Sequence, residues 1–84
     1  MAELILEYET RVVGPRGQSY GARCLGEPSP GGTWIGWLEF RSLDPDGTIL
    51  RTERETTQPD LSALRYWASG LEPVFLEGAL ARAR

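Results

Sequence analysis

The sequence contains no histidine, no lysine and only one cysteine, Cys24. Without histidine the chain cannot build a Ser-His-Asp triad or a Cys-His pair, and it lacks the commonest transition-metal ligand. One cysteine forms neither an intrachain disulfide nor a cysteine-based zinc site. The absence of lysine excludes Schiff-base chemistry and the lysine of a phosphate-binding P-loop. Carboxylates, Tyr, Ser, Thr and Arg remain, so we expect no enzyme, no metal site and no cofactor.

Positive charge is also scarce. Nine arginines against twelve acidic residues give a net charge of −3. Binding to duplex DNA draws most of its affinity from clustered positive charge, so the sequence disfavours a duplex-DNA partner. A stacking platform for single-stranded nucleic acid is disfavoured for the same reason. Its candidate residues are Trp34, Trp37, Trp67, Tyr8, Tyr20 and Tyr66, with Arg23, Arg41, Arg51 and Arg54.

No run of 18 apolar residues occurs, and residues 1–10 carry three glutamates and no basic segment. We therefore expect neither a membrane-spanning helix nor a signal peptide, and predict a cytoplasmic location. The use of Arg in place of Lys, together with many Ala, Gly and Pro residues, is typical of a GC-rich bacterial genome. The length of 84 residues indicates one domain, residues 1–84.

Apolar and polar residues alternate through the first half of the chain, which predicts strands. The expected strands are residues 4–12, 18–26, 33–41 and 48–56, with turns at Gly14-Pro15-Arg16-Gly17 and Asp44-Pro45-Asp46-Gly47. Leu64, Trp67, Ala68 and Leu71 then recur at helical spacing, after a start capped by either Gln58 or Asp60. Pro73 fits the start of a second helix over residues 73–83, with a short extended stretch at 74–76 as the alternative.

These patterns predict an α+β fold: a four-stranded antiparallel meander followed by one or two C-terminal helices packed on one face. Large apolar side chains fall on both faces of that sheet. If the apolar side chains on the face without helices stayed exposed to water, the chain would lose about 10 kcal/mol of hydrophobic stabilisation. We therefore predict that the second face binds a partner, with a symmetric dimer as the commonest solution. Coverage of that face by the last helix or the N-terminal segment is the alternative. The predicted interface consists of Ile5, Val13, Leu25, Ile35 and Trp37.

A second candidate site lies where the last strand joins the first helix. It mixes charge, hydroxyl groups and an amide, and arginine can grip a carboxylate or phosphate in bidentate fashion. The residues are Arg51, Arg54, Thr56, Thr57, Gln58 and Tyr66. Helix capping and pairing at the strand edge explain the same residues without a ligand.

Three segments resemble a group of small bacterial proteins without an assigned activity. They are residues 54–59 (RETTQP), 66–80 (YWASGLEPVFLEGAL) and 32–40 (GTWIGWLEF). The resemblance implies a compact bacterial domain and carries over no site. The function that the sequence favours is a non-catalytic interaction module, as a homodimer or an accessory subunit. Binding of a small anionic ligand is the alternative, followed by single-stranded nucleic-acid binding or an enzyme.

Overall fold

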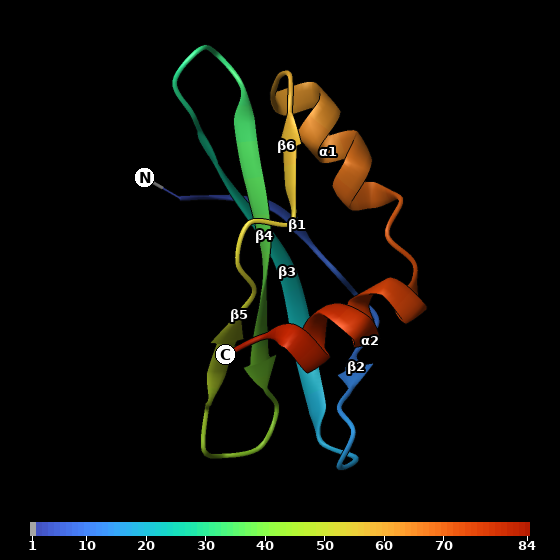
Figure 1. Ribbon diagram of the computed structural model, residues 1–84. Helices are drawn as coiled ribbons and strands as arrows, with labels where there is room; N and C mark the ends of the chain where they lie inside the picture. Colours follow the sequence, from blue (N-terminus) through green and yellow to red (C-terminus); the bar gives the residue numbers. More distant parts are fainter. Residues whose placement is uncertain (1) are drawn as a thin grey trace.

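An antiparallel sheet and two C-terminal helices make up the fold (Figure 1), which confirms the predicted α+β class. The computed structural model describes residues 2–84. Along the chain the elements are β1 (Glu3–Glu7), β2 (Val12–Val13), β3 (Ser19–Pro28), β4 (Trp34–Ser42), β5 (Ile49–Arg51), β6 (Thr56–Gln58), α1 (Leu61–Ser69) and α2 (Pro73–Arg82). In space the strands follow the order β1-β3-β4-β5, with β2 beside β3 and β6 beside β4.

The sheet has six strands rather than the predicted four, because each edge strand is interrupted. β1 and β2 pair with successive parts of β3, while β5 and β6 pair with successive parts of β4. Between β5 and β6, the Thr52 N–H donates to the Leu38 carbonyl (2.9 Å) and the Glu55 N–H to the Gly36 carbonyl (2.8 Å). Between the pairs Glu39–Arg51 and Gly36–Thr56, four residues (52–55) face two residues of β4 (37–38), so two residues are inserted. The Thr52 hydroxyl accepts the Leu38 N–H (3.0 Å), so a side chain replaces a ladder carbonyl there.

A β-bulge in β1 changes which apolar side chains face which side of the sheet. Leu4 lies opposite Leu25 and Leu6 opposite Cys24, so Ile5 is the extra residue. Ile5 packs against the core on the helix side, whereas Leu4 lies on the other side and is 53% exposed. The predicted placement of Ile5 on the second face is therefore wrong. Strict alternation assigns faces correctly only where no residue is inserted.

Both helices begin at residues that the sequence offered as starts. The Asp60 side chain accepts a hydrogen bond from the Ala63 N–H (2.8 Å), so Asp60 rather than Gln58 caps α1. Pro73 is the first residue of α2, where its missing N–H costs no helical hydrogen bond. Residues 73–82 are helical throughout, so the extended alternative at 74–76 is not observed.

The core lies between the helices and one face of the sheet. Its largest fully buried side chains are Phe40, Leu38, Leu64 and Cys24. Helix α1 comes closest to the sheet where Gly26 on β3 lies directly opposite Gly36 on β4. A Cβ at Gly26 would lie 2.6 Å from Leu64 Cδ2, and a Cβ at Gly36 would lie 2.7 Å from Leu64 Cδ1. The two glycines therefore form a hole in the sheet that the Leu64 side chain fills.

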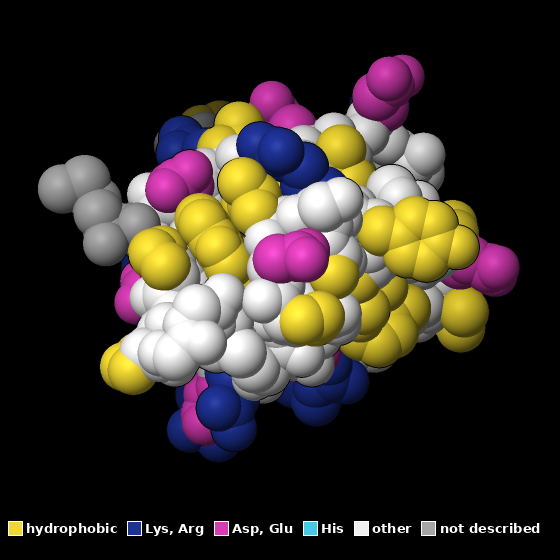
Figure 2. All heavy atoms as spheres, turned by 90° about the horizontal axis from the view of Figure 1, so that it is seen from above, with side chains coloured by type: hydrophobic (Ala, Val, Ile, Leu, Met, Phe, Trp, Pro, Cys, Tyr) yellow, Lys and Arg dark blue, Asp and Glu magenta, His cyan; other side chains and the backbone are white. Residues whose placement is uncertain are grey.

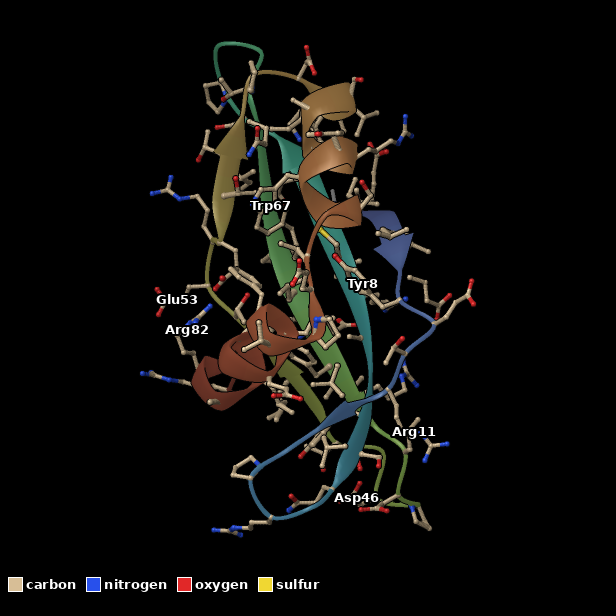
Figure 3. The ribbon with its side chains drawn as sticks, turned by 90° about the vertical axis from the view of Figure 1, so that its right-hand side faces the viewer. Tyr8, Arg11, Asp46, Glu53, Trp67 and Arg82 are labelled. Atoms are coloured by element: carbon tan, nitrogen blue, oxygen red, sulfur yellow. The ribbon has the colours of Figure 1, made fainter. Side chains whose placement is uncertain are left out.

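Aromatic side chains connect the helices to each other and to the sheet edge. The Tyr8 hydroxyl, just after β1, donates to the Ala68 carbonyl of α1 (2.8 Å; Figure 3). Trp67 of α1 meets Phe75 of α2 edge to face, with ring centroids 6.1 Å apart. These contacts fix both helices on the same face. The elements that the structure describes leave the opposite face of the sheet without a covering layer (Figure 1).

We expect Gly26→Ala to lower the free energy of unfolding by about 1–3 kcal/mol, the cost typical of an overpacked core. The added methyl group would meet the buried Leu64 at 2.6 Å and the Ile35 carbonyl oxygen at 3.0 Å. Urea denaturation followed by tryptophan fluorescence measures the change.

Gly78→Ala on α2 is the matched control. A Cβ there would meet Arg82 at 3.9 Å, and alanine is favoured over glycine in a helix by about 1 kcal/mol, so stability should rise. Equal unfolding free energies for the wild type and Gly26→Ala would contradict the close approach of α1.

Candidate functional site

The face of the sheet opposite the helices, called the open face below, carries a row of apolar side chains. Leu4 lies beside Leu25, and Leu25 beside Trp37, so the three cross β1, β3 and β4 in a line. Ile35 extends this row two residues further along β4. Leu4 is exposed, Leu25 is 9% exposed between its neighbours, and Ile35 and Trp37 are half-buried. A contiguous apolar row of this kind on the surface is typical of a binding face.

Apolar side chains also reach the surface of the helical layer. Figure 2 shows hydrophobic side chains on the side of α1, and Tyr66 on α1 and Val74 on α2 are 83% and 74% exposed. They belong to different helices, and single exposed apolar side chains are common on proteins. The open face is the stronger candidate, because strand pairing places its apolar residues next to one another.

A charged row runs parallel to the apolar row. Strand pairing aligns Glu7, Arg23, Glu39 and Arg51 across β1, β3, β4 and β5, so the sign alternates from strand to strand. At the centre, the Arg23 Nε donates to Glu39 Oε1 (2.5 Å) and the Arg51 Nε donates to Glu39 Oε2 (3.0 Å). The Glu39 side chain is only 3% exposed, although it lies on the open face. Both of its oxygens are therefore satisfied by charged donors, as a buried carboxylate requires.

These contacts set the protonation state of Glu39. Burial on its own raises the pKa of this carboxyl group. The hydrogen bonds and positive charges of Arg23, followed by those of Arg51, outweigh burial and hold the pKa of Glu39 below its ordinary value. Glu39 is thus a permanent anion near neutral pH, and it fixes the position of two guanidinium groups on the open face.

A hollow of about 330 Å³ lies beside the charged row. Its side-chain lining includes Glu7, Arg23, Glu39, Arg41 and Leu43. Gly21 leaves room at its base, since a Cβ on Gly21 would meet nothing closer than Leu43 Cδ2 at 3.9 Å. Within residues 2–84, neither Glu7 nor Arg41 has an ion-pair partner. The hollow therefore offers both space and uncompensated charge.

A second groove, of about 540 Å³, lies between the end of α2 and the connection from β5 to β6. The Arg82 guanidinium bonds to Glu55 (2.6 Å), and Arg82 lies near Glu53 in Figure 3. Arg51 and Arg84 exchange two backbone hydrogen bonds of 3.0 Å. In the described part of the chain, every buried side-chain nitrogen and oxygen has a hydrogen-bond partner, so no orphaned polar atom marks this groove as a ligand site.

The six residues predicted to bind an anionic ligand do not share one cavity. Arg51 bonds to Glu39 on the open face, and Thr57 lies on that face opposite Ile35. Thr56 lies on the helix side beside Gly36, and its hydroxyl accepts a hydrogen bond from the Gln58 amide (2.6 Å). Two residues remain apart from these groups: Arg54, exposed between β5 and β6, and Tyr66, exposed on α1.

Four of the five predicted interface residues lie on the open face. Leu25, Ile35 and Trp37 lie together on the open face, and Val13 lies on the same face toward the other end of β3, where it is 49% exposed. Ile5 belongs to the core, and Leu4 occupies the position expected for it. Whether this set forms an interface stays a prediction.

Two groups with raised pKa values have structural roles. Burial, with a smaller contribution from Cys24, raises the pKa of the Tyr8 hydroxyl, which is engaged with Ala68. Burial raises the pKa of the Cys24 thiol to about 12, and the side chain is fully enclosed. Among residues 2–84 no group of three His, Cys, Asp or Glu side chains is placed to hold a metal ion. The same residues include no helix with the length and apolar character needed to cross a membrane.

Comparison with protein-family models, curated proteins and solved structures found no match to this chain. The resemblance to small bacterial proteins therefore gains no support from these comparisons. The functional interpretation rests on the geometry of the open face.

Several residues of this face were absent from both predicted site sets: Leu4, Glu7, Gly21, Arg23, Glu39, Arg41 and Leu43. Glu39 carried a usable signal, because it is a lone carboxylate between Leu38 and Phe40 in the most apolar strand. Such a residue requires a cationic partner if its strand is central. The identity of the partners, Arg23 and Arg51, depends on strand register, which alternation alone does not determine.

We expect Glu39→Gln to reduce the free energy of unfolding at pH 7 and to weaken its dependence on acid pH. The folded-state pKa of Glu39 is depressed, so its stabilising effect is complete above the unfolded-state pKa of about 4.3 and is lost as pH falls through the folded-state pKa. The gap in unfolding free energy between the wild type and Glu39→Gln should therefore narrow below about pH 4.

Urea titrations at several pH values measure this gap. Glu77→Gln, which removes an exposed carboxylate on α2, is the matched control and should follow the wild type. A gap for Glu39→Gln that stays constant down to about pH 3, roughly one unit below the ordinary glutamate pKa, would rule out an ionic role for this residue.

Proposed function

We propose that this protein is a non-catalytic interaction module that binds a protein partner through the open face of its sheet. The observation that carries the proposal is the apolar row of Leu4, Leu25 and Trp37 beside a charged row held by Glu39. An apolar centre flanked by fixed charges is the usual composition of a specific protein–protein interface.

The rigidity of the face supports this role. Arg23 and Arg51 each spend a guanidinium N–H on Glu39, so their side chains are ordered before any partner arrives. Ordering long side chains on association costs roughly 0.5–1.5 kcal/mol each, and a preorganised face avoids part of that cost. The central strands β3 and β4 are also the longest in the sheet, which gives the face a firm base.

The competing functions receive less support. Binding of a small anion would require Arg51, Arg54 and the nearby hydroxyl groups to converge, and they lie on different sides of the sheet. Catalysis would require a titratable group in a cavity with a free functional role. Of the two groups with raised pKa values, Cys24 is fully buried, and the half-buried Tyr8 donates its hydroxyl to the Ala68 carbonyl.

The proposal predicts that Leu4→Arg abolishes partner binding without unfolding the chain. Leu4 is 53% exposed on an edge strand, so an arginine there should be tolerated by the fold while placing a charge in the apolar row. Tagged wild-type and variant chains are expressed in the source cells, and the proteins that co-purify are quantified by mass spectrometry. Recovery of the partner should fall at least about tenfold.

Tyr66→Arg is the matched control, because it places the same charge at an 83% exposed aromatic position on the helical layer. It should retain the partner. If both variants retain every protein that the wild type binds, the open face is not the interaction surface. Circular dichroism confirms that each variant is folded.

A further inference from the structure

The pattern of charge and size on the open face specifies its occupant. Resting on the proposed function, we infer that the partner is a second copy of this chain, packed face to face about a two-fold axis parallel to β3 and β4. Such an axis preserves each cross-strand row but reverses its order. It therefore places β3 of one copy over β4 of the other, and β1 over β5.

The charged row is complementary to itself under this operation. Reading from β1 to β5, the row runs Glu7, Arg23, Glu39, Arg51. Its reversed copy sets Glu7 against Arg51 and Arg23 against Glu39, so each charge meets one of opposite sign. An in-plane axis perpendicular to the strands would set each of these residues against its own copy, with like charges in contact. Complementary potential favours the first arrangement over one whose perpendicular axis passes through this row.

Side-chain size follows the same symmetry. On the open face β3 presents Ser19, Gly21, Arg23, Leu25 and Glu27, whereas β4 presents Ile35, Trp37, Glu39 and Arg41, followed by Leu43 just after the strand. Reversal sets Leu25 against Trp37 and Gly21 against Arg41. The hollow over Gly21 has its complement in the protruding Arg41 of the other copy. That guanidinium would reach a site whose lining includes Glu7 and Glu39.

The available area is sufficient for a dimer. β3 has ten residues, which at about 3.4 Å each span roughly 34 Å, and four strand positions about 4.8 Å apart span roughly 19 Å. The footprint is therefore about 600 Å² per copy, or about 1,200 Å² in total, at the lower limit for specific interfaces. Aligned packing of two sheets is a standard way to cover apolar faces.

Gly21→Val tests the hollow. The nearest atom to a Cβ at Gly21 is Leu43 Cδ2, at 3.9 Å, and the φ of Gly21 is not positive. Valine should therefore leave the single chain as stable as the wild type or more stable, given its β propensity. The same side chain would occupy the site of the partner's Arg41. Sedimentation equilibrium should show a dimer dissociation constant at least about tenfold higher than that of the wild type.

A charge exchange tests the symmetry. Arg41→Glu sets a new carboxylate against Glu7 twice in each homodimer, and Glu7→Arg places two guanidinium groups together at the same contacts. Each variant alone should dissociate at least about tenfold more readily than the wild type. In a heterodimer of the two variants, one contact joins the introduced glutamate to the introduced arginine. The other contact joins the unmodified Glu7 of one copy to the unmodified Arg41 of the other, so both contacts pair opposite charges. The two variants should therefore form a heterodimer in preference to either homodimer, and native mass spectrometry separates the three species.

The outcomes distinguish this inference from the proposed function. A monomeric wild type throughout the micromolar range overturns the second-copy partner, while loss of a different protein in Leu4→Arg still upholds the open face as an interaction surface. A wild-type dimer that is insensitive to Gly21→Val, with no heterodimer preference in the charge exchange, overturns the two-fold arrangement. A heterodimer preference together with weaker association of Gly21→Val supports it.

Discussion

The insertion of Leu64 between Gly26 and Gly36 is the contact on which the rest of the structure depends. This contact brings α1 close to the middle of the two longest strands. A side chain at Gly26 or Gly36 would collide with Leu64 and prevent this approach. The position of α1 in turn brings Ala68 within reach of Tyr8 and Trp67 within reach of Phe75, which fixes α2 on the same face. One face of the sheet becomes the core, and the other remains the open face.

The open face combines an ionic centre with an apolar row. Glu39 occupies a central strand, where a carboxylate without partners would be strongly destabilising. Arg23 and Arg51, one on each neighbouring strand, bond to its two oxygens and make the position tolerable. The same bonds hold two cations at defined places beside Trp37 and Leu25. Under the proposed function, the ion pairs that stabilise the sheet would also order the binding face.

Much of this fold follows from the sequence. The alternation around Trp34 and Phe40, the two proline-glycine turns, the Asp60 cap and the Pro73 start each depend on neighbours close in the chain, and each is confirmed. The placement of Leu25, Ile35 and Trp37 on one face follows from the period of two within unbroken strands. Features that depend on how the strands are aligned with one another could not be predicted from the sequence. The bulge that moves Ile5 into the core inserts one residue, and the break after Arg51 that divides the last strand inserts two, both without a local sequence signal. The Glu39 ion pairs and the hollow at Gly21 join positions from different strands.

The two interrupted edges of the sheet limit the addition of further chains by strand pairing. A long, regular edge strand offers a row of unpaired amide and carbonyl groups on which further chains can add, as in fibril growth. Here each edge consists of short strands of two to five residues, offset by a bulge or a bend. Short, offset edges are poor templates for strand addition, so an assembly through the proposed face would be closed and finite rather than an open-ended polymer.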